Sequence, residues 1–212
     1  SLMANTVFPT KGNLIATKKS LSLAKLGFDL LDRKRNILIR EMMTLVDKAK
    51  SLHGEIEVTY QKAYLALQRA NITLGVIEDL SHSAGIENGI EIDYRSVMGV
   101  DIPKVRCTST LKSNEYAFFE TNSQFDAAYL NFNRAKELTI LLAEVENSVY
   151  RLADAIKKTQ RRANALKNIS IPRFEETVRY ISSALDEKER EEFSRLKVIR
   201  RTKDKADKQK DA

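Results

Sequence analysis

The chain has 212 residues, of which 31% are charged, with seven glycines, three prolines and no tryptophan. This composition is typical of long helices and argues against a sheet protein. The formal net charge is +7, and Cys107 is the only cysteine, which excludes a disulfide within the chain. No segment approaches the ~20 apolar residues that a membrane-spanning helix needs. We therefore expect a soluble, elongated, mostly helical protein of a reducing compartment.

Residues 1–9 are interpreted as a lead-in, whose first two residues resemble a cloning remnant. Thr10 is the expected N-cap of the first helix, with Asn13 as the alternative. Because a seven-residue apolar period follows without a proline, the segment 10–75 is predicted to be one uninterrupted helix.

The apolar period of this first helix predicts a left-handed coiled coil. Fourteen of the eighteen a and d positions between Leu14 and Thr73 are apolar, and a 3.5-residue period sustained over many heptads imposes that supercoil. The a and d positions form the seam of the coiled coil, and Arg35 is the one charged residue among them. Either its stem lies along the seam while its guanidinium reaches water, or it fixes the register of the helices or meets an acidic partner. The predicted seam residues of this helix are Leu14, Leu21, Phe28, Leu31, Leu38, Met42, Leu45, Ala49, Leu52 and Ile56.

The segment 76–114 is predicted to be a central insert that contains a β-hairpin. Apolar and charged residues alternate from Ile90 to Tyr94, which indicates a half-buried strand. A turn is expected at Met98, and Pro103 suits an edge strand. A two-stranded hairpin is marginal by itself, so this one should pack on the helices or on a partner. The residues expected at the hairpin and at a stalk-partner contact are Ile90, Ile92, Tyr94, Val97, Met98, Val100 and Ile102.

The helical pattern returns over the segment 115–200. Its seam residues are Leu138, Leu142, Val145, Val149, Leu152 and Ile156, and the seam continues to Phe193 and Leu196. Pro172 should kink this helix, and the seam shifts there by one residue. Seam alanines crowd the insert-proximal ends of both helices, which favours antiparallel packing within one chain. The charged segment 201–212 is expected to be disordered.

The sequence offers no constellation for catalysis or for a bound metal or cofactor. His53 and His82 have no carboxylate or cysteine at ligand spacing, and no glycine-rich phosphate loop occurs. The acidic cluster 186–192 alternates with basic residues, which ion pairs along a helix explain better than catalysis. Both chain ends are basic; residues 1–50 hold ten Lys and Arg against four Asp and Glu.

Three separated segments go beyond a generic coiled coil. The first reads Pro9-Thr10-Lys11, Leu14, Lys18-Lys19, Leu21, Ala24, Gly27, Leu30-Leu31 and Lys34-Arg35. The central one reads Val97-Met98-Gly99-Val100. The last reads Arg161-Arg162-Ala163-Asn164-Ala165-Leu166, Ile171-Pro172, Ile181, Leu185, Glu189-Arg190-Glu191 and Arg195-Leu196-Lys197. Together these segments resemble the D subunit of the V-type (A/V-type) rotary ATPases, and the resemblance spans nearly the whole chain.

The resemblance implies a central rotor shaft that catalyses nothing itself. Its termini would enter the pore of the hexamer of catalytic A and B subunits, and its middle would meet the F subunit and the C/d-type subunit on the membrane ring. It would belong to the peripheral V1/A1 sector on the cytoplasmic face of the membrane, without inserting into the membrane or binding nucleic acid. It would couple ATP hydrolysis or synthesis to H⁺ or Na⁺ transport. Whether the hairpin binds the F subunit or modulates ATPase activity stays open.

Basic side chains near the two termini are the predicted contacts between rotor and stator. They are Lys11, Lys18, Lys19, Lys25, Arg190, Arg195, Lys197 and Arg200. The alternative hypothesis is a basic coiled-coil adaptor for nucleic acid or an anionic membrane surface. That adaptor has no use for the central hairpin.

Overall fold

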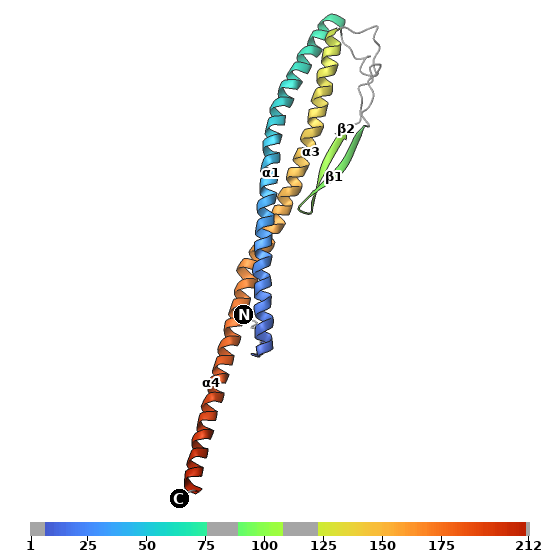
Figure 1. Ribbon diagram of the computed structural model, residues 1–212. Coiled ribbons are helices and arrows are strands. Elements are labelled where there is room, and N and C mark those ends of the chain that lie inside the picture. Colours follow the sequence, from blue (N-terminus) through green and yellow to red (C-terminus); the bar gives the residue numbers. More distant parts are fainter. Residues whose placement is uncertain (1–6, 76–88, 108–122, 211–212) are drawn as a thin grey trace. The chain divides into compact units, whose positions relative to one another are not determined.

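The computed structural model describes residues 7–75, 89–107 and 123–210. Its elements are α1 (Lys11–Leu74), β1 (Ile90–Val97), β2 (Val100–Cys107), α3 (Ser123–Ala165), the π-helical turn η2 (Leu166–Ser170) and α4 (Ile171–Lys210) (Figure 1). The chain divides into two units, one formed by residues 1–33 with 159–212 and the other by residues 34–158. None of the described helices is both long enough and apolar enough to cross a bilayer.

Local capping explains where α1 begins and ends. The backbone N–H of Asn13 donates to Oγ1 of Thr10 at 3.1 Å, which is the N-cap bond expected from the sequence. At the other end Gly75 adopts a φ of +80°, and its N–H donates to the carbonyl of Asn71 at 3.0 Å. A left-handed residue after the last turn is the usual way to stop a helix, and glycine takes it without a steric penalty.

In the unit of residues 34–158, α1 packs antiparallel to α3. Leu38 is buried with Leu152, whereas Leu52, further along α1, is buried with Leu138 and Val145, which lie earlier on α3. Rising numbers on α1 therefore meet falling numbers on α3, and Figure 1 shows the two ribbons side by side. The predicted fold class, mostly helical with two long packed helices and a short hairpin between them in sequence, is confirmed.

The unit of residues 1–33 and 159–212 repeats the antiparallel arrangement. Lys25 pairs with Glu175 at 2.8 Å, and Lys11, earlier on α1, pairs with Glu189, later on α4, at 3.1 Å. Among the described residues of this unit, the buried apolar side chains are Ala24, Ala163 and Ile181.

The central insert contains the predicted β-hairpin. Strands β1 and β2 pair antiparallel from Ile90 opposite Cys107 to Val97 opposite Val100, and a two-residue turn joins them. Both turn residues have positive φ, 51° at Met98 and 76° at Gly99, as in the primed turns that match strand twist.

A π-helical turn lies directly before Pro172. The N–H of Ile171 donates to the carbonyl of Leu166, five residues earlier, so η2 holds one more residue than an α-helical turn would. Proline has no N–H, and its ring would clash with the carbonyl four residues earlier in a regular helix. The wider turn relieves that clash, and its extra residue accounts for the one-residue shift of the apolar seam.

Three expectations differ from the structure. The sequence predicts a disordered tail over 201–212, whereas α4 continues to Lys210, since no glycine or proline follows Pro172 to stop it. It predicts Phe193 and Leu196 on the seam, yet they are 70% and 64% exposed, because α1 begins opposite Glu189 and leaves the next turns uncovered. It predicts a half-buried strand at Ile90, Ile92 and Tyr94, which are instead exposed.

Candidate partner-binding surfaces

The predicted seam residues form the interior of the helix pair. Leu38, Leu52, Leu138, Val145 and Leu152 are buried. The others are half-buried: Leu14, Leu21, Phe28, Leu31, Met42, Leu45, Ala49, Ile56, Leu142, Val149 and Ile156. These side chains hold the helices together, so candidate contacts with a partner are sought among other residues.

The predicted rotor–stator residues divide into two groups. Lys11 and Lys25 form ion pairs with α4 within the chain. The hydrogen bond and the charge of Lys25 lower the pKa of the Glu175 carboxyl below its usual value. The other six are exposed and free of such pairs within the described part of the chain: Lys18, Lys19, Arg190, Arg195, Lys197 and Arg200.

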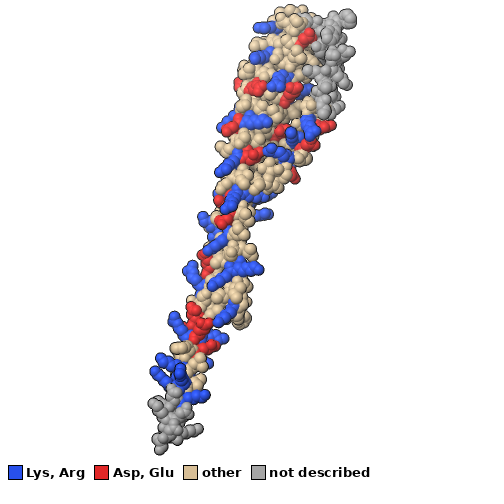
Figure 2. All heavy atoms as spheres, viewed as in Figure 1, with Lys and Arg blue, Asp and Glu red and all other residues tan. Residues whose placement is uncertain are grey.

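The α4 segment of residues 190–203, which we call the α4 extension, is exposed at every position. It combines basic residues with apolar ones: Phe193, Leu196, Val198 and Ile199 are 54–70% exposed. A shallow hollow on it is lined by Ser194, Arg195, Val198 and Ile199. Figure 2 shows basic side chains along the last described turns of α4. Exposed apolar residues among positive charges are suited to a partner surface with acidic and apolar groups.

Exposed apolar residues also occur on the first turns of α1, where sequence reasoning missed them. Ile15, Leu23, Leu26 and Leu30 are 55–69% exposed. Each lies off the a and d positions of the heptad, and this off-seam placement is the signal that could have identified them. We call these four residues the α1 apolar set.

Apolar packing and polar contacts attach the hairpin to the helices of its unit. Ile102 is buried against Leu38 and Leu152. Arg151 donates from Nη1 to the carbonyl of Asp101 at 3.0 Å, and its guanidinium lies 5.3 Å from the centroid of the Tyr94 ring. Two further attachments are a hydrogen bond from the Val105 N–H to the Glu144 carboxylate at 2.6 Å and an ion pair between Arg95 and Glu41 at 2.5 Å.

The predicted hairpin contacts are therefore not equivalent. Ile102 is an anchor inside the unit, and Val97 and Val100 are half-buried beside it. The residues left available to a partner are Ile90, Ile92, Tyr94 and Met98, which are 45–61% exposed.

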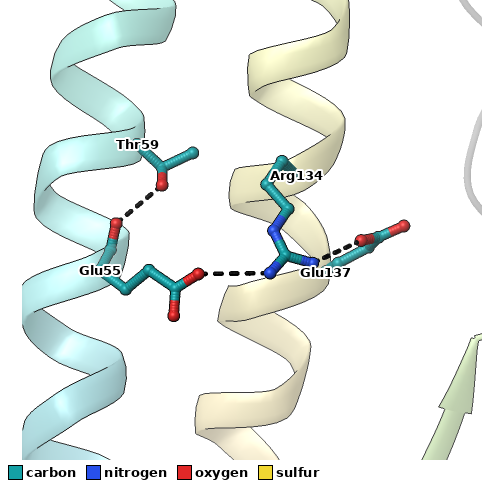
Figure 3. Close-up of polar contacts among 4 residues, drawn as sticks. All are labelled: Glu55, Thr59, Arg134 and Glu137. Carbon is teal, nitrogen blue, oxygen red and sulfur yellow. Dashed lines mark hydrogen bonds and ion pairs between the residues drawn. The ribbon is translucent and has the colours of Figure 1, made fainter.

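Ion pairs also cross between α1 and α3 on the surface. Arg134 binds Glu55 of α1 at 3.2 Å and Glu137 of its own helix at 3.4 Å, while the Thr59 hydroxyl donates to the Glu55 carbonyl (Figure 3). All three charged side chains are more than half exposed, so each pair contributes only about 0–1 kcal/mol. Among the residues with described positions, no group of His, Cys, Asp or Glu could hold a metal ion.

The geometry defines a class: a paired-helix scaffold with exposed apolar and basic surfaces. Comparison with known proteins gives the family. The family model for the ATP synthase D subunit matches residues 13–201. The D subunit of the V-type ATP synthase of Thermotoga neapolitana is 44% identical over 92% of this chain and 97% of its own length. The D subunit of the A-type ATP synthase of Thermococcus kodakarensis is 39% identical over 92% of this chain and 93% of its own length. That of Pyrococcus abyssi is 40% identical over 91% of this chain and 92% of its own length.

The chain belongs to the D-subunit family of the V/A-type ATP synthases, whose members are central-stalk components of rotary ATPases.

Proposed function

We propose that the chain is the rotor shaft itself, a non-catalytic subunit that couples ATP hydrolysis or synthesis in other subunits to rotation of a membrane ring. The observation that supports this most is the antiparallel pairing of α1 with α3 and α4 through a long series of apolar side chains. Helices that interlock side chain by side chain resist sliding and twisting past each other. A part that transmits torque needs this resistance.

The proposed partners of the α4 extension and the α1 apolar set are the catalytic A and B subunits. Exposed ion pairs with acidic loops contribute only about 0–1 kcal/mol each, so such contacts can break at every step of rotation. The apolar side chains add a contact that salt does not screen.

In this proposal, a coupling free energy links the angle of the rotor to the nucleotide affinity of the catalytic sites. A pair of helices has no threefold symmetry, so it presents different side chains to each catalytic interface. Each rotor angle then favours a different set of open and closed sites, and nucleotide binding must bias the rotor angle in return.

The proposed partners near the hairpin are the F subunit and the C/d-type subunit on the rotor ring. The exposed hairpin residues Ile90, Ile92 and Tyr94 support a partner contact there. The chain would then be a peripheral component on the cytoplasmic face of the membrane, and the ion, H⁺ or Na⁺, would be set by other subunits.

Two truncations test the proposal in the assembled complex. One variant ends at Glu189 and lacks the α4 extension; the matched control ends at Arg201 and keeps nearly all of it. We expect the first to lose most of the ion transport per ATP hydrolysed while ATP hydrolysis continues, and the control to stay close to wild type. Coupled transport and rotation that survive the Glu189 truncation intact would show that this chain is not the shaft.

The net charge of +7 and the exposed basic side chains of α4 favour one second candidate, a basic adaptor for nucleic acid or anionic membranes. It predicts binding of the purified chain to duplex DNA or anionic vesicles that falls by orders of magnitude between about 50 and 200 mM salt. Weak binding with a shallow salt dependence would eliminate it.

A further inference from the structure

The two edges of the β-hairpin are treated differently by the fold. On β2, the outward N–H of Val105 donates to Glu144, and the outward carbonyl of Asp101 accepts from Arg151. The acceptor Glu144 and the donor Arg151 both belong to α3. They are seven residues apart and therefore lie on one face of that helix. The outer edge of β2 is therefore occupied by α3.

The outer edge of β1 has no such partner among the described residues. Because Val97 and Val100 close a two-residue turn, they form a hydrogen-bonded pair, and the pairs alternate from there. The backbone groups of Ile90, Ile92, Tyr94 and Ser96 must then point away from β2. All four residues are exposed, and the sheet has two strands only, within the described part of the chain.

Strand β1 lacks two of the features that block an exposed edge, proline and a bulge. Proteins protect free edges with proline, with charged side chains, especially lysine, or with a bulge. Pro103 and Lys104 lie on β2, whereas the eight residues of β1 include neither residue type, and its register to β2 is continuous. The charged residues of β1, which are Glu91, Asp93 and Arg95, alternate with the positions whose backbone groups face outward, and those outward positions carry no charge. The open strand is therefore less protected than β2.

The spacing of these groups identifies what can bind them. Outward N–H and carbonyl groups recur every second residue, about 6.6–6.8 Å apart, which only another extended strand matches in series. The same residues place Ile90, Ile92 and Tyr94 on one face of the hairpin, so the added strand would gain from apolar side chains at alternating positions.

We propose that the outer edge of β1 receives a third β-strand from another subunit of the rotary complex. This inference rests on the proposed function, because the hairpin is the surface assigned there to a stalk partner. A different subunit is favoured over a second copy, since two chains of net charge +7 repel each other.

The first test removes one outward N–H and keeps the hairpin. In Ile92→Pro the lost N–H faces away from β2. Pro103, which lies opposite Tyr94, shows that this hairpin accepts proline at an outward-facing position of the other strand. The matched control Ile92→Thr keeps the N–H and shortens the apolar side chain. With the complex assembled from all of its subunits, we expect Ile92→Pro to weaken retention of the stalk partner about tenfold or more and Ile92→Thr less than about threefold. Equal losses in both variants, or none in either, would overturn edge pairing.

The second test uses the unmodified chain, so it does not depend on the folding of a variant. Amide hydrogen exchange is measured residue by residue for the chain alone and for the assembled complex. The outward amides of Ile92, Tyr94 and Ser96 should become protected on assembly, while the inward amides of Asp93 and Arg95 are protected in both states. Unchanged exchange at the outward amides refutes the proposal.

The two proposals fail in distinguishable ways. If the wild-type chain does not assemble with the other subunits, the proposed function is wrong. If it assembles and the outward amides stay unprotected, only edge pairing is wrong. If those amides become protected in the isolated chain as its concentration rises, the added strand comes from a second copy and the assigned partner is wrong.

Discussion

Leu166 packs against Gly27 where η2 meets the first turns of α1: a Cβ built on Gly27 would lie 3.5 Å from Cδ1 of Leu166. That distance is an ordinary van der Waals contact, so alanine fits there without displacing its neighbour. The available space therefore does not require glycine at position 27.

Gly27→Ala should stabilise the protein by about 0.5–1 kcal/mol, because glycine inside a helix costs that much conformational entropy relative to alanine. Gly54→Ala is the matched control, since no atom lies within 4 Å of a Cβ at that position. Denaturant unfolding monitored by helical circular dichroism measures both. A loss of stability confined to Gly27→Ala would mean that the Leu166 contact is tighter than the geometry indicates.

Deleting Ile169 should be tolerated far better than deleting Ala153. Ile169 is 67% exposed within η2, and removing one residue there converts the π-helical turn to an α-helical one with both flanking seams still aligned. Deleting Ala153 inside α3 rotates every following side chain by about 100° and breaks the seam.

The Ile169 deletion is best made together with Pro172→Ala, which removes the ring that a regular helix would not accommodate. Thermal unfolding of the two deletion variants, each in the Pro172→Ala background, makes the comparison. Equal destabilisation would show that η2 does not absorb an extra residue.

Leu152→Ala should destabilise the unit of residues 34–158 by about 2–5 kcal/mol, the usual loss when a buried leucine leaves a cavity. Leu152 is fully buried between Leu38 and Ile102, so the change weakens both the helix pair and the hairpin attachment. Leu130→Ala, at a position 57% exposed, is the control and should cost less than about 1 kcal/mol. Urea unfolding curves distinguish the two, and similar losses would contradict the described packing.

The ion pair between Lys25 and Glu175 should make stability depend on pH. Lys25 lowers the pKa of the folded Glu175 carboxyl below its unfolded value, so its stabilisation is present above the unfolded pKa and is lost as pH falls through the folded pKa. The stability difference between wild type and Lys25→Gln should therefore shrink as pH is lowered from neutral through that acidic range. Lys18→Gln, at an exposed position outside any described ion pair, should show no such trend. Denaturant unfolding at a series of pH values measures it, and a difference constant with pH would count against the pair.

Much of the fold could be predicted because one period runs through so many residues. A row such as Leu38, Leu45 and Leu52 has one structural explanation, and the seam alanines at Ala63 and Ala135 allowed the antiparallel partner to be found within the same chain. Both alanines are fully buried. Many seam residues specify the same register along a long helix, so an error at one position does not change the predicted pairing.

The candidate surfaces were harder to predict because they depend on which of two similar faces is covered. The hairpin has apolar residues on both faces, with Ile92 on one and Ile102 on the other. The helices cover the face of Ile102, where Leu38 and Leu152 leave an apolar site, and this choice lies in tertiary packing, which strand alternation does not encode. The exposure of Phe193 similarly depends on where a different helix begins.

The α4 extension has a consequence for how the protein responds to heat. A helix without a packed neighbour is held only by its own backbone bonds and by the turns that precede it, so it frays from its free end in small steps. Loss of helix there would be gradual, whereas the paired segments of α1 and α3 would melt together. A partner that encloses the α4 extension would make that gradual loss cooperative, so the sharpness of the melting curve would report whether the helix end is engaged.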